Sequence, residues 1–90
     1  MRVTVKYELV IASIVGLEFE IVELPEGTAI AGLIEILCAR HSSRFRNIVF
    51  MQAGSRKYMV NFIVNTAYVK DSYTLKDGDE LTIVLGLGGG

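Results

Sequence analysis

One segment of the chain changes its hydrophobic period, and this change limits the possible folds more than any other feature. Within residues 25–41 the apolar side chains recur at helical spacing, and the stripe they form contains Ile30, Leu33, Ile34, Leu37 and Cys38. Pro25 and Gly27 end the preceding segment, and Thr28 stands where its hydroxyl can cap the first turn. The sequence therefore predicts one long helix that buries a single face.

The segments on both sides of this helix alternate apolar and polar residues, which is typical of half-buried strands. Before the helix we expect strands over residues 3–9 and 17–24, paired as an antiparallel hairpin through a loop at 10–16 that ends in the Gly16 turn. After it we expect strands over 58–65 and 80–87, the second preceded by the turn Asp77-Gly78-Asp79. The side chains expected to face inward are Val3, Val5, Tyr7, Leu9, Leu17, Phe19, Ile21, Val60, Phe62, Val64, Leu81, Ile83 and Leu85.

This order of elements, two strands, one main helix and two strands, predicts an α+β fold in which a mixed sheet wraps around the helix. Residues 42–57 fit either a short helix or a strand, followed by a polar loop around Gly54. The 90 residues suffice for one domain. We expect this domain at residues 1–85 and a flexible glycine-rich tail at 86–90.

The composition argues against several classes of partner. Nine basic and ten acidic residues give a net charge of -1 without a basic stripe, which disfavours nucleic acid. The apolar run at residues 9–16 is shorter than the ~20 residues of a membrane span, and Glu8 at its front edge disfavours an export signal. A single cysteine, Cys38, forms no internal disulfide and indicates a cytoplasmic protein. We expect Cys38 in the core and His41 solvated at the helix end.

Three stretches resemble the ubiquitin-like β-grasp sulfur carrier proteins, and most closely the small subunit of molybdopterin synthase. They are the strand VNFIVN at 60–65, the segment LKDGDELTIV at 75–84 and the terminal Gly89-Gly90. The resemblance spans nearly the whole chain and implies a β-grasp fold and a carrier protein or non-catalytic subunit rather than an enzyme. The tail departs from the molybdopterin branch, which usually has prolines where this chain has the run from Leu85 to Gly88, and its alternating leucines are similar to the tail of ubiquitin.

The resemblance also implies a function and its site. The C-terminal carboxylate of Gly90 is expected to be adenylated by an E1-like enzyme that uses ATP, and then converted to a thiocarboxylate for molybdopterin (molybdenum or tungsten cofactor) biosynthesis. The expected second partner is the large subunit of molybdopterin synthase, and no bound cofactor or metal is implied. Gly88 and Gly89 give clearance, because residues without a Cβ atom pass through a narrow channel. The residues expected to bind partners beside the tail are Ile63, Val84, Leu85 and Leu87.

Two other classes of function fit the same residues. One is a ubiquitin-like modifier that is joined to lysines through Gly90, and the other is an interaction module whose glycines are incidental. Within the carrier class, thiamine synthesis and tRNA thiolation are alternative destinations of the sulfur, and the insertion after the helix favours the molybdopterin branch by resemblance. An iron–sulfur variant is excluded because one cysteine cannot supply four ligands. Asp77, Asp79 and Glu80 fit a tight turn better than a cation site.

Overall fold

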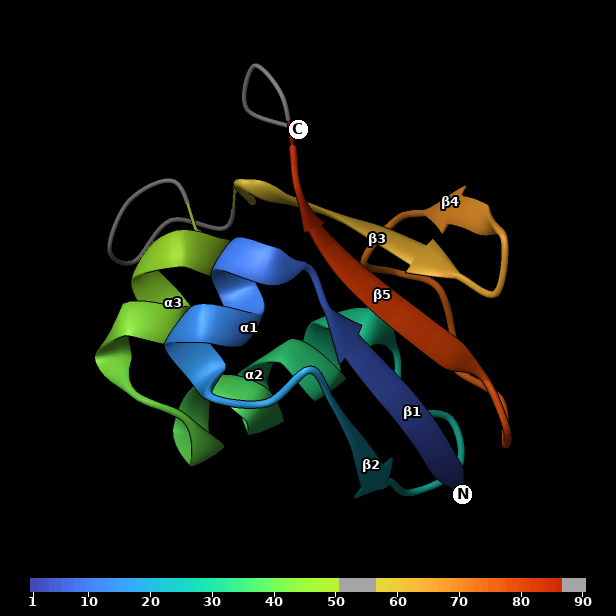
Figure 1. Ribbon diagram of the computed structural model, residues 1–90. Helices are drawn as coiled ribbons and strands as arrows, with labels where there is room; N and C mark the ends of the chain where they lie inside the picture. The colour runs from blue at the N-terminus through green and yellow to red at the C-terminus, as the bar shows by residue number, and fades with distance from the viewer. Residues whose placement is uncertain (51–56, 87–90) are drawn as a thin grey trace.

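The computed structural model describes residues 1–50 and 57–86, which form one mixed sheet with helices on one side of it (Figure 1). The sheet has five strands in the order β2-β1-β5-β3-β4. In chain order the elements are β1 (Arg2–Tyr7), α1 (Leu9–Val15), β2 (Phe19–Glu23), α2 (Ile30–Arg40), α3 (Ser43–Val49), β3 (Val60–Val64), β4 (Ala67–Val69) and β5 (Glu80–Leu85). The α+β class and the mixed sheet are therefore confirmed, with more helices than the sequence predicted.

The pairing of the strands places β5 at the centre of the sheet. β1 pairs antiparallel with β2, as the hairpin prediction required, and parallel with β5. β3 pairs antiparallel with both β5 and β4. Because β5 is hydrogen-bonded to β1 on one side and to β3 on the other, these two strands hold its position in the sheet.

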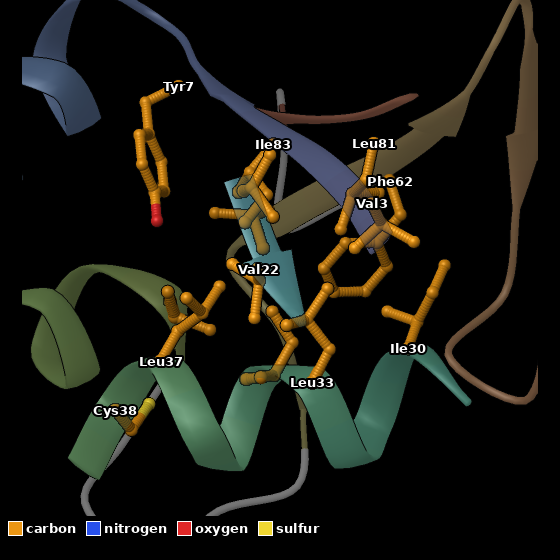
Figure 2. Close-up of a cluster of buried hydrophobic side chains, with 14 of the residues drawn as sticks. Val3, Tyr7, Val22, Ile30, Leu33, Leu37, Cys38, Phe62, Leu81 and Ile83 are labelled. Atoms are coloured by element: carbon orange, nitrogen blue, oxygen red, sulfur yellow. The ribbon is translucent and has the colours of Figure 1, made fainter. Parts of the chain in front are cut away.

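The core lies between the sheet and α2. All five residues of the predicted helical stripe are buried, and Leu33 and Leu37 are completely inaccessible to solvent. Figure 2 shows Ile30, Leu33 and Leu37 pointing from α2 toward side chains of the strands, including Ile83 and Leu81. Burial of one such aliphatic side chain contributes about 1.5–3 kcal/mol, so this layer supplies most of the driving force for folding.

The first turn of α2 differs from the prediction. Thr28 does not cap the helix: Ala29 is the N-cap residue, and the Thr28 hydroxyl donates to the Pro25 carbonyl oxygen at 2.7 Å. The amides of Ile30 and Ala31 donate instead to the carbonyl oxygens of Tyr73 and Asp71, each at 3.0 Å. Since the connection before β5 satisfies these donors, a side-chain cap is unnecessary.

The predicted loop over residues 10–16 is wrong, because this segment forms the helix α1. Ile11 is fully buried, and the Ala12 amide donates to the Glu8 carbonyl oxygen at 2.7 Å. Gly16 ends the helix with a φ of 86°, a left-handed conformation that suits glycine. Leu9, which was expected to face inward as part of a strand, begins this helix and is 84% exposed.

The inward face of β2 was also predicted wrongly. Phe19 and Ile21 are 57% and 55% exposed, and Leu17 is exposed as well, whereas Val22 and Leu24 are buried. The segment 17–24 carries apolar residues on both of its faces, so alternation alone does not choose between them. Glu20 shares the buried face with Val22 and Leu24, and its carboxylate is hydrogen-bonded there by Tyr7, Arg40 and His41.

Residues 43–49 form α3, so the helical alternative for this region is the right one. Its apolar residues Phe45 and Val49 are fully buried, four positions apart on one helical face. The predicted polar loop around Gly54 lies outside the described residues. Within residues 1–50 and 57–86, no helix is long and apolar enough to span a lipid bilayer.

Candidate functional site: the root of the C-terminal tail

The candidate site begins where β5 leaves the sheet. β5 ends at Leu85, and Gly86 is the last residue that the structure describes. Figure 1 shows this end of β5 at the side of the molecule where α1 begins. The predicted tail residues Leu87, Gly88, Gly89 and Gly90 lie outside the described residues, so their roles stay predictions.

Two hydrogen bonds hold the backbone at this root. The Leu85 amide donates to Oε2 of Glu8 at 2.7 Å, and the Gly86 amide donates to the Met59 carbonyl oxygen at 2.8 Å. The register of β1 and β5 ends at the pair Tyr7 and Ile83, so Leu85 lies past the last residue of β1. The Glu8 side chain therefore extends the ladder by one bond, and it fixes the direction in which the chain leaves β5.

The opposite end of β5 is held by the predicted turn. Gly78 has a φ of 84°, and its amide donates to the Arg2 carbonyl oxygen at 2.8 Å. Asp79 is buried and accepts hydrogen bonds from the Lys76 amide at 2.9 Å, from the Tyr73 hydroxyl at 3.2 Å and from the Asn65 amide group at 3.3 Å. These contacts identify Asp79 as a structural acceptor of the turn, and Asp77 accepts from the Arg2 amide at 2.8 Å.

Ile63 and Val84 lie on the outer face of the sheet, as predicted. Ile63 pairs with Thr82 and Val84 pairs with Asn61, so the two apolar residues are diagonal neighbours on adjacent strands. Both are half-buried rather than open. Leu85 is also half-buried and packs against the core. Their role in partner binding stays a prediction.

Sequence reasoning missed the residues that surround the tail root. Glu8 is the acceptor for Leu85, and the next two side chains, Leu9 and Val10, are 84% and 51% exposed. A signal for the helix was present, because Ile11, Ile14 and Val15 have the spacing i, i+3 and i+4, and all three contribute to the core. The bond from Glu8 to Leu85 had no such signal, since 77 residues separate the two.

A second carboxylate, Glu20, organises the same end of the sheet. It accepts from the Tyr7 hydroxyl at 2.5 Å and from Nη1 of Arg40 at 2.9 Å, and its Oε2 lies 2.6 Å from Nε2 of His41. Burial acts to raise the pKa of Glu20, but the hydrogen bonds from Tyr7, His41 and Arg40 outweigh it and lower the pKa below its ordinary value. His41 also contacts the ring of Phe45 edge to face, so the prediction that it is solvated is wrong.

Cys38 lies in the core, as predicted, at the end of the apolar stripe of α2. Burial raises the pKa of its thiol, which leaves little thiolate at neutral pH. Among residues 1–50 and 57–86, no group of three or more His, Cys, Asp or Glu side chains is arranged to hold a metal ion. Within the described part of the chain, the candidate site therefore stays at Leu85 and Gly86, where β5 leads into the C-terminal tail.

Comparison with known proteins supports the β-grasp fold. The chain is 34% identical to a candidate molybdopterin converting factor, subunit 1, from Pyrococcus furiosus; the match covers 97% of this chain and 99% of that one, with a TM-score of 0.81. Small archaeal modifier protein 1 from Haloferax volcanii matches with a TM-score of 0.84 at 19% identity, over 100% of both chains. Its counterpart from Methanosarcina acetivorans matches with a TM-score of 0.78 at 19% identity, over 99% of this chain and 96% of that one.

The two modifier proteins are similar to this chain in fold alone, whereas the Pyrococcus protein is similar in sequence over nearly the full length of both chains. No curated protein matches the chain. The profile of the ThiS family matches residues 9–90, from the first turn of α1 to the terminal glycine. The chain therefore belongs to the ThiS family, and its fold is the ubiquitin-like β-grasp.

Proposed function

We propose that this protein is a sulfur carrier whose C-terminal carboxyl group, on Gly90, is activated by adenylation and converted to a thiocarboxylate. The observation that carries the proposal is membership of the ThiS family over a match that includes the terminal Gly88-Gly89-Gly90. The geometry at the root of the tail supports it, since Leu85 and Gly86 are held at the end of a central strand. The carrier is a substrate of other enzymes rather than a catalyst.

The proposed chemistry takes place on the main chain in two steps. An oxygen of the Gly90 carboxylate attacks the α-phosphorus of ATP, which forms an acyl-adenylate and releases pyrophosphate. A hydrosulfide-level sulfur nucleophile then attacks the carbonyl carbon, the bond to the AMP oxygen breaks, and AMP leaves with the electron pair. The product is a terminal thiocarboxylate, and ATP is consumed by the activating enzyme without being bound as a cofactor of the carrier.

Glycine suits both steps because the reacting carboxyl must enter the active site of another protein. Residues 88–90 have no Cβ atom, so a narrow channel accommodates them where any other residue is obstructed. Ordering a flexible chain lowers its conformational entropy, at roughly 1–2 kcal/mol per residue. The hydrogen bonds at Leu85 and Gly86 limit this loss, because they fix the chain immediately before the glycines.

We further propose that the sulfur is delivered to molybdopterin. The support is the 34% identity with the candidate molybdopterin converting factor subunit from Pyrococcus furiosus. On this proposal the chain has two successive partners, an E1-like adenylating enzyme and the large subunit of molybdopterin synthase. Each has to bind the same tail, one to form the thiocarboxylate and one to use it.

The test is the intact mass of the protein after incubation with the adenylating enzyme of its own organism, ATP and a sulfur donor. We expect an increase equal to the replacement of one oxygen by one sulfur, located on the C-terminal peptide. The chain that lacks Gly89 and Gly90 is the matched control and is expected to keep its mass. Wild-type protein that keeps its mass in the complete mixture contradicts the proposal.

The destination of the sulfur is tested with the thiocarboxylated protein and the large subunit of molybdopterin synthase. Conversion of the sulfur-free pterin precursor to molybdopterin, with return of the carrier to its carboxylate form, is the expected result. Transfer of sulfur to a thiamine precursor or to tRNA instead contradicts the destination but not the carrier function. Isopeptide conjugates in cell extract that depend on Gly90 would favour protein modification.

A further inference from the structure

We propose that the exposed first turn of α1, with Leu9 and Val10, is the docking surface for the adenylating enzyme that activates the C-terminal carboxyl group. This inference rests on the proposed function and names the face of the carrier that the activating enzyme covers. It differs from the sequence-based expectation, which placed partner binding on Ile63, Val84, Leu85 and Leu87. It is supported by exposure, by a connection to the tail root, by the reach of the tail and by the absence of charge on α1.

Exposure is the first observation. Leu9 is 84% exposed, the highest value among the large apolar side chains of the described part of the chain, and Val10 beside it is 51% exposed. The helix that carries them is well anchored, because Ile11 is fully buried in the core. Adjacent apolar side chains that a rigid element holds in water are a feature of binding surfaces.

The first turn of α1 is tied directly to the root of the tail. The Glu8 amide donates to the Ile83 carbonyl oxygen at 3.1 Å, and the Glu8 carboxylate accepts from the Leu85 amide at 2.7 Å. Leu9 follows Glu8 in the chain, and α1 packs against β5 and α3. Figure 1 shows α1 beginning at the end of the molecule from which β5 departs. The two exposed side chains and the tail root are therefore parts of one fixed surface.

The length of the tail decides what must cover this surface. Four residues follow Gly86 in the sequence. Fully extended, four residues span at most about 14 Å. A protein whose active site holds the Gly90 carboxyl therefore has that site within about 14 Å of the root. Since an enzyme surrounds its active site on several sides, its surface lies against the residues beside the root. Leu9 and Val10 are the exposed apolar residues that directly follow Glu8, which is hydrogen-bonded to the root.

We expect the surface of the activating enzyme that contacts α1 to be apolar. The sequence of α1 is LVIASIV, which contains no charged residue, and the one adjacent carboxylate, Glu8, already accepts a hydrogen bond from the tail root. The exposed Phe19 and Ile21 are a weaker candidate, because β2 lies at the sheet edge and β1 separates it from β5. The inference therefore commits to an apolar rim around the tail-accepting cleft of the activating enzyme.

The experiment measures steady-state thiocarboxylate formation by the adenylating enzyme of the same organism, with the carrier as the varied substrate. The double variant Leu9→Glu and Val10→Glu is expected to raise the KM for the carrier about tenfold or more, since central apolar contacts dominate binding energy. The maximal rate at saturating carrier is expected to stay unchanged, because the tail itself is intact. Thermal unfolding should be unaffected, as both positions are open to solvent.

Two matched controls introduce glutamate at other exposed apolar positions. Tyr68→Glu alters β4, where Tyr68 is 72% exposed, and Phe19→Glu alters the free edge of the sheet, where Phe19 is 57% exposed. Both are expected to leave the KM close to the wild-type value, because a charge outside the contact area changes mainly the association rate and its salt dependence. An equal increase in KM for either control overturns the inference, because it attributes the effect to charge alone.

The outcomes separate this inference from the function on which it rests. If the wild type gains sulfur and the double variant has the same KM, the docking surface is elsewhere and the carrier function stands. If the wild type gains no sulfur, the carrier function fails and the docking inference fails with it. If only the α1 variant has a raised KM and the maximal rate is kept, both are supported.

Discussion

The two ends of β5 are held in different ways. At its beginning, the turn at residues 76–79 folds on itself around the buried Asp79, which accepts from the Lys76 amide three residues away. At its end, within the described residues, the strand is held by two hydrogen bonds to distant parts of the chain. The amide of Leu85 is held by the carboxylate of Glu8, 77 residues away in the sequence and open to solvent.

This difference indicates that the start of β5 contributes mainly to the stability of the domain, whereas the end of β5 contributes mainly to the position of the tail root. The start of β5 is a local, buried arrangement whose loss affects the whole domain. The bond from Leu85 to Glu8 at the end of β5 is solvent-accessible, so we expect its loss to act locally, on the last residues of the strand. The proposed carrier function requires both, because a stable domain has to present a C-terminal carboxyl group that reaches the active site of another protein.

The largest effect is expected at Asp79. The substitution Asp79→Ala removes the buried carboxylate that accepts three part-buried hydrogen bonds, from the Lys76 amide, the Tyr73 hydroxyl and the Asn65 side chain. We expect the free energy of unfolding to fall by about 2–3 kcal/mol. Urea denaturation monitored by circular dichroism measures the loss.

The neighbouring Asp77 is the matched control for Asp79. Its carboxylate is exposed and accepts one hydrogen bond, from the Arg2 amide at 2.8 Å. Asp77→Ala is expected to lower the free energy of unfolding by less than about 1 kcal/mol. Equal losses for the two variants contradict the view that burial of Asp79 fixes this end of the strand.

A smaller and pH-dependent effect is expected at Glu20. Glu20→Gln removes the negative charge that Tyr7, Arg40 and His41 surround, and it should lower the free energy of unfolding by about 1–2 kcal/mol near neutral pH. The pKa of Glu20 is lower in the folded protein than its ordinary value of 4.5, so the unfolded chain takes up this proton first. The stabilisation is therefore complete above pH 4.5 and is lost as the pH falls through the folded-state pKa.

The measurement for Glu20 is the free energy of unfolding of wild type and variant across an acid pH series. The difference between the two proteins should shrink toward zero at the acid end. Glu35→Gln is the control, because Glu35 forms an exposed ion pair with Arg46 and is expected to change stability little at any pH. A difference between wild type and Glu20→Gln that is constant with pH contradicts the role of the charge.

The next effect concerns backbone conformation in the turn. Gly78 has a φ of +84° and open space where a Cβ atom would stand, so Gly78→Ala adds strain without a clash. We expect a loss of about 1 kcal/mol, the usual penalty for a left-handed alanine. Gly16→Ala is the matched variant, since Gly16 has a φ of +86° and equally open surroundings at the end of α1. Unchanged thermal stability of Gly78→Ala contradicts this account of the turn.

The sequence predicted the start of β5 better than its end, for a physical reason. The turn and the stripe of α2 depend on residues that are close in the chain, and both Gly78 and Leu37 lie as expected. On β2 the buried face combines Val22 and Leu24 with Glu20, whose partners are Tyr7 from another strand and Arg40 from a helix. No local pattern contains that information.

The missed helix α1 is the instructive case at the tail end. The alternation of residues 3–9 predicts a strand that continues to Leu9, but β1 ends at Tyr7. Glu8 instead makes two hydrogen bonds to β5: its amide donates to the Ile83 carbonyl oxygen, and its carboxylate accepts from the Leu85 amide. The exposed Leu9 and Val10 then follow in a helix. The sequence therefore suggested that the tail is functional and gave no sign of the surface that surrounds its root.

The smallest effect on stability, and the most local one, is expected at Glu8. Glu8→Ala removes the acceptor of the Leu85 amide, which water then solvates, so the free energy of unfolding should fall by less than about 1 kcal/mol. Hydrogen exchange at Leu85 should nevertheless accelerate about tenfold, because the end of the strand opens locally. Glu8→Gln keeps a carbonyl oxygen and should retain most of the protection, whereas Asp79→Ala should lower the global stability without selectively exposing this amide. If Leu85 exchanges at the wild-type rate in Glu8→Ala, the Met59 carbonyl oxygen at Gly86 is sufficient to hold the root, and the two ends of β5 differ less than their contacts indicate.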